Sequence, residues 1–145
     1  MSWRSEYAKK KQTAEQALES VRSGMRVYIQ PGCAEPETLV EALLKRGPFV
    51  RNVKVVHLLT LGSADYVRPE MEGQFRHNAI FIGGNVCEAV NDGRADYTPV
   101  NLSEVEQLFE SGAMPLDVAL IQVSPPDPHG FCSFGVGVDT TLTAA

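Results

Sequence analysis

The sequence predicts one α/β domain, a mostly parallel, Rossmann-like open sheet with helices on both faces. Short apolar runs alternate with segments of helical spacing, and loops rich in glycine and proline separate the two. The run at residues 53–61 is apolar almost throughout, which is typical of a strand covered on both faces. With 145 residues, the chain is long enough to bury a core and shows no interdomain linker.

The first helix is predicted from Thr13, because residues 13–16 read Thr-Ala-Glu-Gln, the pattern of a capping box. Apolar residues continue at helical spacing as far as Val21, and Gly24 is expected to end the helix. The first strand is then predicted at residues 25–29.

A second helix is predicted to begin near Glu35, with Pro36 at the first helical position, where a missing N–H costs nothing. The side chains expected on its inner face are Leu39, Val40, Leu43 and Leu44. A basic pair and a glycine at 45–47 mark its end, and the strand at 53–61 follows.

The middle of the chain carries weaker signals. Residues 62–76 are predicted to be a polar connection with one short helix, and residues 79–82 a short buried strand. A further helix is expected to begin at 85–88. Residues 96–100 predict only a weak strand, because Pro99 has no N–H to donate.

A second capping box, at residues 103–106, predicts the next helix, with Gly112 after its end. The apolar run at 118–123 then predicts a buried strand. Residues 139–141 resemble the start of another helix that the remaining four residues are too few to finish. We therefore expect the chain to be a piece of a longer protein.

Loops that follow parallel strands meet at one edge of the sheet, where helix N-termini direct free N–H groups at a ligand. The loops at Gly32, Gly83 and Ser124 are expected to lie on that edge. The third of them, residues 124–130, reads Ser-Pro-Pro-Asp-Pro-His-Gly and is the stiffest segment of the chain. Within it, Asp127 is expected to form an Asx turn rather than to act in acid–base chemistry.

Composition excludes several classes of partner. A net charge of -5 argues against a nucleic-acid backbone or an anionic membrane. No apolar run approaches the roughly 18 residues that cross a bilayer, and the polar N-terminus is no secretory signal. Three widely spaced cysteines suit a reducing compartment, so a cytoplasmic location is expected. The histidines and cysteines show no metal-site spacing.

Four segments carry a resemblance to a known family. Residues 123–135 read Val-Ser-Pro-Pro-Asp-Pro-His-Gly-Phe-Cys-Ser-Phe-Gly, and the stretch 117–139 around them closely resembles the acetyl-CoA hydrolase/transferase family. Within that family, the chain looks most like the 4-hydroxybutyrate and butyrate CoA-transferases. Support comes from Gly-Cys-Ala-Glu-Pro at 32–36, Thr-Leu-Gly at 60–62 and Gly-Arg-Ala-Asp-Tyr-Thr-Pro at 93–99.

The resemblance implies ping-pong transfer of CoA between carboxylic acids. A glutamate carboxylate attacks the acyl-CoA thioester, and a mixed anhydride and then a glutamyl-CoA thioester form. Coenzyme A is thus a substrate, and no cofactor is implied. In the family, that glutamate and a glycine-rich loop lie in a second α/β domain. Residues 1–145 would then be the N-terminal domain of a fragment whose C-terminal catalytic domain is absent, and inactive alone.

The resemblance also implies that the acyl group or carboxylate lies in the cleft between the two domains. The candidate substrate-binding residues are Gly32, Cys33, Ala34, Glu35, Pro36, Ser124, Pro125, Pro126, His129 and Gly130. Backbone N–H groups of the helix after Glu35 would favour a bound carboxylate. The implied partners are acyl-CoA, small carboxylic acids, the second domain and further copies in a homo-oligomer.

Several of these residues have a structural alternative. Cys33 precedes a helix, where a thiolate is stabilised, but no base is apparent, so a loop-lining role is expected. Glu35 is expected to order its loop, with substrate contact as the alternative. His57 is expected in the core and His77 on the surface. His129 either contacts substrate or fixes its own loop.

Two further expectations concern contacts within the domain. Arg94 and Asp96 are expected to form a structural ion pair. Trp3 and Tyr7 are expected to hold the N-terminal arm against the body or against a partner subunit.

Three other functions remain open. An acyl-CoA hydrolase would use water in place of the acceptor acid. A binding or assembly subunit would use the apolar tail from Phe131 as an interface. A nicotinamide-binding domain is disfavoured, because neither Gly83-Gly84 nor the glycines at 135–137 complete a G-x-G-x-x-G turn.

Overall fold

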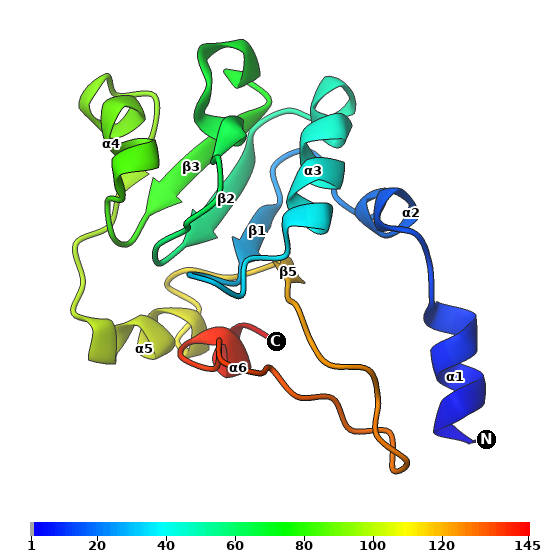
Figure 1. Ribbon diagram of the computed structural model, residues 1–145. Coiled ribbons are helices and arrows are strands. Elements are labelled where there is room, and N and C mark those ends of the chain that lie inside the picture. Colours follow the sequence, from blue (N-terminus) through cyan, green and yellow to red (C-terminus); the bar gives the residue numbers. More distant parts are fainter. Residues whose placement is uncertain (1) are drawn as a thin grey trace.

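The computed structural model describes residues 2–145. In this part of the chain, five strands form one parallel sheet in the order β4-β3-β2-β1-β5 (Figure 1). The strands are β1 (Arg26–Ile29), β2 (Val53–His57), β3 (Phe75–Ala79), β4 (Asp96–Tyr97) and β5 (Val118–Leu120). The predicted α/β class and open parallel sheet are confirmed.

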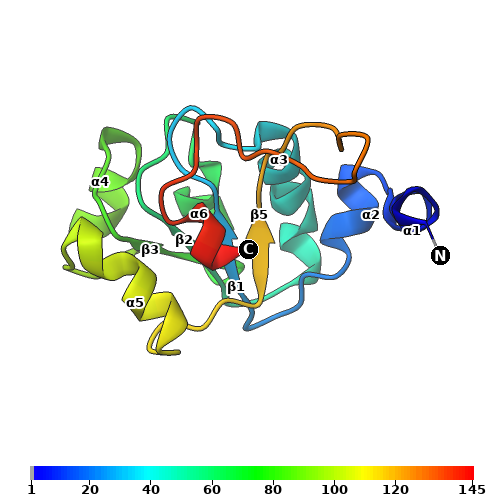
Figure 2. The ribbon, with the colours of Figure 1, turned by 90° about the horizontal axis from the view of Figure 1, so that it is seen from below.

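Helices cover both faces of this sheet (Figure 2). One face carries α2 (Ala14–Leu18), α3 (Glu37–Arg46) and α4 (Gly84–Asn91). The other face carries α5 (Val105–Glu110) and α6 (Thr141–Ala144). The N-terminal helix α1 (Trp3–Lys10) has no buried residue and lies beside this body.

Alternating side chains of the central strands build the two core layers. Val27 and Ile29 of β1 face α2 and α3, whereas Tyr28 between them faces α5. Tyr28 meets Phe109 edge-on, with ring centroids 5.8 Å apart. Because both faces of β1 are covered, Val27, Tyr28 and Ile29 are consecutive apolar residues and all three are buried.

The capping box at Thr13 is confirmed, since the Gln16 amide donates to Thr13 Oγ1. The helix is shorter than predicted and ends at Leu18. Val21 is nevertheless fully buried, as part of the turn that leads to β1. A buried apolar residue at helical spacing therefore does not by itself extend a helix.

Two other helix starts differ from the prediction. Pro36 is the N-cap of α3 rather than its first residue. The capping box at 103–106 is wrong, because Asn101 and Glu104 form it at the start of a 3₁₀ turn that leads into α5. The Glu104 carboxylate accepts from the Asn101 backbone amide at 3.4 Å and from its side-chain amide at 2.8 Å, so the capping contacts start two residues before the predicted position.

The strand predicted at 79–82 is wrong in position, because β3 covers Phe75–Ala79. Its buried residues alternate as Phe75, His77 and Ala79, with half-buried Arg76 and Asn78 between them. This is the pattern of a strand, but a histidine in a core position conceals it. The connection before β3 holds two short 3₁₀ turns, Asp65–Val67 and Pro69–Met71, instead of the single helix expected.

The two longest predicted strands are also shorter than expected. β2 ends at His57, and the apolar residues after it run along the edge of the sheet as a loop. β5 ends at Leu120, and it is an edge strand that pairs with β1. The prediction that 118–123 is a buried strand is therefore only partly correct.

Among the described residues, no helix has both the length and the apolar character needed to cross a membrane.

Candidate functional site

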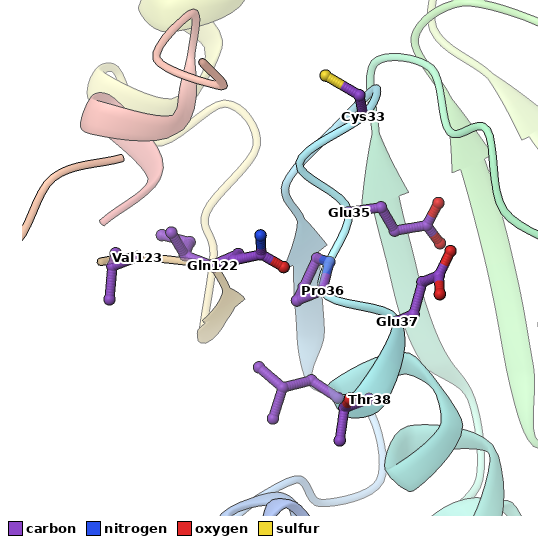
Figure 3. A pocket seen from close by; sticks show the side chains of 9 residues that line it. Cys33, Glu35, Pro36, Glu37, Thr38, Gln122 and Val123 are labelled. Atoms are coloured by element: carbon purple, nitrogen blue, oxygen red, sulfur yellow. The ribbon is translucent and has the colours of Figure 1, made fainter. Parts of the chain in front are cut away.

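A cavity of about 540 Å³ lies between the loop after β1 and the chain that leaves β5 (Figure 3). Its lining residues are Cys33, Glu35, Pro36, Glu37, Thr38, Leu39, Ile121, Gln122 and Val123. A second cavity of about 370 Å³ shares Cys33, Gln122 and Val123 with the first and continues toward Ser133–Val136. Both lie at the carboxyl ends of the strands, where open α/β sheets bind ligands.

The three loops predicted to meet at this edge do so. The Gly32 amide donates to the Leu59 carbonyl at 2.7 Å, which joins the loops after β1 and β2. Asn85, in the first turn of α4, donates to the carbonyls of Thr60 and Gly62. The loop after β5 joins them through Gln30.

Gln30 directly follows β1 and is fully buried. Its Nε2 donates to the Gly137 carbonyl and its Oε1 accepts from the Gln122 amide, each at 2.7 Å. A Cβ at Gly137 would lie 2.6 Å from the Ala34 Cβ, so only glycine fits there. Gln30 thereby positions the chain on both sides of the cavities. Sequence reasoning missed it, although an amide at the end of an apolar strand is a signal.

Glu35 is 8% exposed and orders its loop, as expected. Its Oε2 accepts from the Gly62 amide at 2.8 Å and from the Thr60 hydroxyl. Burial raises the pKa of this carboxyl, the Gly62 amide opposes that shift, and nearby Glu37 adds to it. Figure 3 shows the side chain extending away from Gln122 on the opposite wall.

The segment 124–130 bonds to itself and to residues 131–133, which follow it. Asp127 Oδ1 accepts from the amides of His129 and Phe131 at 2.8 and 2.9 Å, which confirms the Asx turn. Ser124 Oγ accepts from the Ser133 amide at 2.9 Å and closes the base of this hairpin-like loop. The loop leaves the sheet and extends toward α1 (Figure 1).

Trp3 holds the tip of that loop. Its indole Nε1 donates to the Pro128 carbonyl at 3.3 Å. Gly130 lies against the ring with φ +94°, and a Cβ there would lie 2.9 Å from the indole. Trp3 therefore fixes the N-terminal arm as expected, whereas Tyr7 is exposed.

Some of the candidate residues lie at the cavities and the others do not. Cys33, Glu35 and Pro36 line the larger cavity, and Cys33, Ala34 and Ser124 line the smaller one. Gly32 lies beside them through its contacts with the loop after β2. The rest of the candidate residues line neither cavity: Pro125, Pro126, His129 and Gly130.

Beneath the edge lies a buried aromatic cluster. His57 Nε2 lies 2.7 Å from the Tyr66 hydroxyl oxygen, which fixes the loop between them to β2. His57 is in the core as expected, but the surface position expected for His77 is wrong, since it is buried on β3. The ion pair expected between Arg94 and Asp96 is also wrong.

Asp96 of β4 instead pairs with Arg76 on the neighbouring strand β3. The Arg76 Nε donates to Asp96 Oδ2 at 2.8 Å. Arg94 precedes the strand and turns back to the end of α4, where it meets Asp92 at 3.1 Å. Register between strands, which the sequence does not show, decides this pairing.

Comparison with known proteins agrees with this arrangement. Residues 1–145 match the acetyl-CoA hydrolase/transferase N-terminal domain. The chain belongs to the acetyl-CoA hydrolase/transferase family. Of the segments on which the sequence resemblance depended, the Gly32–Pro36 loop and Ser124 lie at the edge described above, whereas the tip of the 124–130 loop lies against Trp3.

Two curated relatives of this chain are named as CoA-transferases. The 4-hydroxybutyrate coenzyme A transferase of Clostridium kluyveri is 45% identical over 145 residues, which are 100% of this chain and 34% of the relative. A succinyl-CoA:acetate/propanoyl-CoA:succinate CoA transferase of Fasciola hepatica is 42% identical over 126 residues, 86% of this chain and 26% of the relative.

Among solved structures of similar fold, RipA from Yersinia pestis superposes with a TM-score of 0.86 at 26% identity. The match covers 97% of this chain and 35% of RipA. This chain therefore spans about a third of the length of the relatives that it matches.

Proposed function

We propose that this chain is the N-terminal domain of a CoA-transferase that moves CoA between an acyl-CoA and a short-chain carboxylate. The carboxylates in question are of the 4-hydroxybutyrate, butyrate or acetate type. The observation that carries the proposal is the 45% identity, over the whole chain, to a 4-hydroxybutyrate coenzyme A transferase. The paired cavities at the carboxyl edge of the sheet support it, because they lie where such a substrate would bind.

The nucleophilic glutamate of this reaction belongs, in our proposal, to polypeptide outside residues 1–145. Glu35 lines the larger cavity, but its carboxylate already accepts two hydrogen bonds and points away from the opposite wall. Glu88 lies on the exposed side of α4, within 4.0 Å of Arg94. A second domain would place its glutamate across the cavities from this edge.

In this proposal, CoA is transferred through an anhydride and a glutamyl-CoA thioester. The glutamate carboxylate attacks the thioester carbonyl and CoA leaves as a thiolate, which gives an acyl–glutamyl anhydride. The thiolate attacks the glutamyl carbonyl, releases the first carboxylate and leaves glutamyl-CoA. The acceptor acid repeats both steps in reverse. CoA is a substrate throughout, and this scheme needs no cofactor.

This domain would hold and orient the substrate. Pro36 is the N-cap of α3 and has no side chain that can bond the first free amides of the helix. The Glu37 and Leu39 amides already donate to the carbonyls of Glu35 and Pro36, so the Thr38 amide, beside the larger cavity, is the one that would hold a carboxylate. The loop Gly32–Pro36 and Ser124 form the wall, while Pro125, Pro126, His129 and Gly130 would reach substrate only if the second domain closes over their loop.

The test compares the 145-residue chain with a longer protein that joins it to a second family domain. Each is incubated with butyryl-CoA and acetate, and the thioesters are separated by chromatography. We expect acetyl-CoA from the longer protein and none from the chain alone. Free CoA in place of acetyl-CoA would favour the hydrolase, and turnover by the 145-residue chain would contradict the proposal.

The proposal also includes a location in the cell and an oligomeric state. A cytoplasmic location is supported by the three cysteines, Cys33, Cys87 and Cys132, which form no disulfide among the described residues. We propose that it works as a homo-oligomer, which light scattering of the longer protein would test.

A further inference from the structure

The segment Thr60–Gly62 is held from two sides. Glu35, from the loop after β1, accepts from the Gly62 amide and the Thr60 hydroxyl. Asn85, from the start of α4, donates to the Thr60 carbonyl at 3.2 Å and to the Gly62 carbonyl at 2.8 Å. Backbone groups on both sides of Leu61 are therefore bonded to side chains of other elements.

Two glycines make these contacts possible. A Cβ at Gly62 would lie 2.6 Å from Glu35 Oε2, so any other residue would push the carboxylate away. A Cβ at Gly83 would lie 2.8 Å from Asn85 Oδ1 and would displace the amide. Both clamping side chains thus depend on a glycine beside them, which is what a built contact requires and a chance surface contact does not.

Leu61, at the centre of the clamp, is 71% exposed. An isolated apolar side chain on a surface is ordinary, but here the backbone on both sides is fixed while the side chain is directed outward. It lies at the carboxyl edge but outside the lining of both cavities, next in sequence to Thr60, which pairs with Gly32 of the cavity loop. A rigid, outward apolar group at this place is suited to contact the hydrocarbon part of a substrate.

We propose that Leu61 determines which acyl groups the site accepts, and that Glu35 and Asn85 are positioning residues that hold it. The proposal rests on the proposed function, because acyl-CoA supplies the hydrocarbon chain. Leu61 contacts the acyl chain directly; Glu35 and Asn85 act through the backbone of its neighbours. A hydrophobic contact of this size distinguishes substrates that differ by one or two methylene groups by about tenfold to a hundredfold.

The positioning role is tested by amide hydrogen exchange on the 145-residue chain. Glu35→Ala and Asn85→Ala should each speed exchange of the Gly62 amide by about tenfold or more, because the local clamp opens. Glu35→Gln keeps an acceptor for that amide and should restore slow exchange. Glu37→Ala, on the same cavity wall, and Asn91→Ala, on the same helix, are the matched controls. Unchanged exchange in both test variants would overturn the positioning role.

The specificity role is tested in the longer protein, by kcat/KM for acetyl-CoA and butyryl-CoA with a common acceptor. Leu61→Ala should change the ratio of the two values by about tenfold, since the contact with the longer chain is lost. Leu102→Ala, an exposed leucine before α5, should leave the ratio unchanged. Glu35→Ala and Asn85→Ala should shift it in the same direction as Leu61→Ala.

An unchanged ratio in Leu61→Ala would overturn the specificity role. Absence of transfer by the unmodified longer protein would instead count against the proposed function and against any acyl contact by Leu61. The exchange experiment would in that case still decide whether Glu35 and Asn85 hold this segment.

Discussion

The imidazole rings of His57 and His77 stack in the core, with their centroids 4.2 Å apart. Each side chain is 1% exposed. His57 bonds the Tyr66 hydroxyl, and His77 Nδ1 lies 2.9 Å from the Val55 carbonyl oxygen. Burial lowers the pKa of His57 well below its usual value and that of His77 to about 4. Both histidines are therefore neutral in the folded protein at pH 7.

This pair should make the domain sensitive to acid. Unfolded histidine binds its proton near pH 6.5, whereas folded His77 does so near pH 4. The unfolded state thus holds more protons between these values, and stability falls as pH drops from 6.5 toward 4. For His77 alone, the loss amounts to roughly 3 kcal/mol. The nearby Asp96 charge, which raises the His77 pKa, limits this loss.

Urea unfolding of the wild type and of His77→Gln at pH 7.5 and pH 5 measures this effect. The variant is expected to be less stable at pH 7.5, because the stack is lost, but the difference should shrink at pH 5. Parallel pH curves for the two proteins would contradict the assignment of acid sensitivity to His77.

Gly130→Ala should separate the Trp3 arm from the proline-rich loop. The new Cβ would meet the indole at 2.9 Å, in a backbone with φ +94°. We expect a loss of about 2–3 kcal/mol, part of it from the positive φ. Gly112→Ala is the control, because φ is +74° there but nothing lies within 4 Å, so only about 1–2 kcal/mol is expected.

Thermal unfolding gives the two stabilities, and limited proteolysis of the loop reports on the arm. Faster cleavage near residue 130 is expected in Gly130→Ala and not in Gly112→Ala. Equal destabilisation with equal cleavage would mean that the Trp3 contact has no role in ordering the loop.

Gln30→Leu should loosen both sides of the cavities. It keeps the side-chain volume but leaves the Gly137 carbonyl and the Gln122 amide without partners. Each unsatisfied buried group costs about 1–3 kcal/mol, so we expect a loss of roughly 2–4 kcal/mol by urea unfolding.

Gln122→Ala is the matched control, because it removes an exposed amide side chain but keeps the backbone N–H that Gln30 bonds. It should unfold within about 0.5 kcal/mol of the wild type. If the stability of Gln30→Leu were also within about 0.5 kcal/mol of the wild type, the bonds from Gln30 would not be what holds Gln122 and Gly137 in place.

Much of the fold could be predicted from sequence because its elements obey simple patterns. Val27 and Ile29 lie in an apolar run, and Thr13 and Gln16 form a local capping box. The pattern failed where a polar residue occupies a core position. His77 concealed β3, and Gln30, just after the first predicted strand, was not recognised as a link to Gly137.

Other features depend on register and were outside the reach of sequence patterns. Arg76 pairs with Asp96 only because β3 and β4 are neighbours in one register. For the site, the loops could be located from sequence, but not the clamp. The contact between Glu35 and Gly62 joins residues 27 positions apart, and no local signal connects them.

The most direct test of the central claim locates the covalent CoA adduct. The longer protein is treated with acyl-CoA, quenched in acid and digested, and the peptide that carries glutamyl-CoA is identified by mass spectrometry. The account predicts an adduct on a glutamate outside residues 1–145 and none on peptides from this domain. An adduct on Glu35, Glu37 or Glu88 would contradict it.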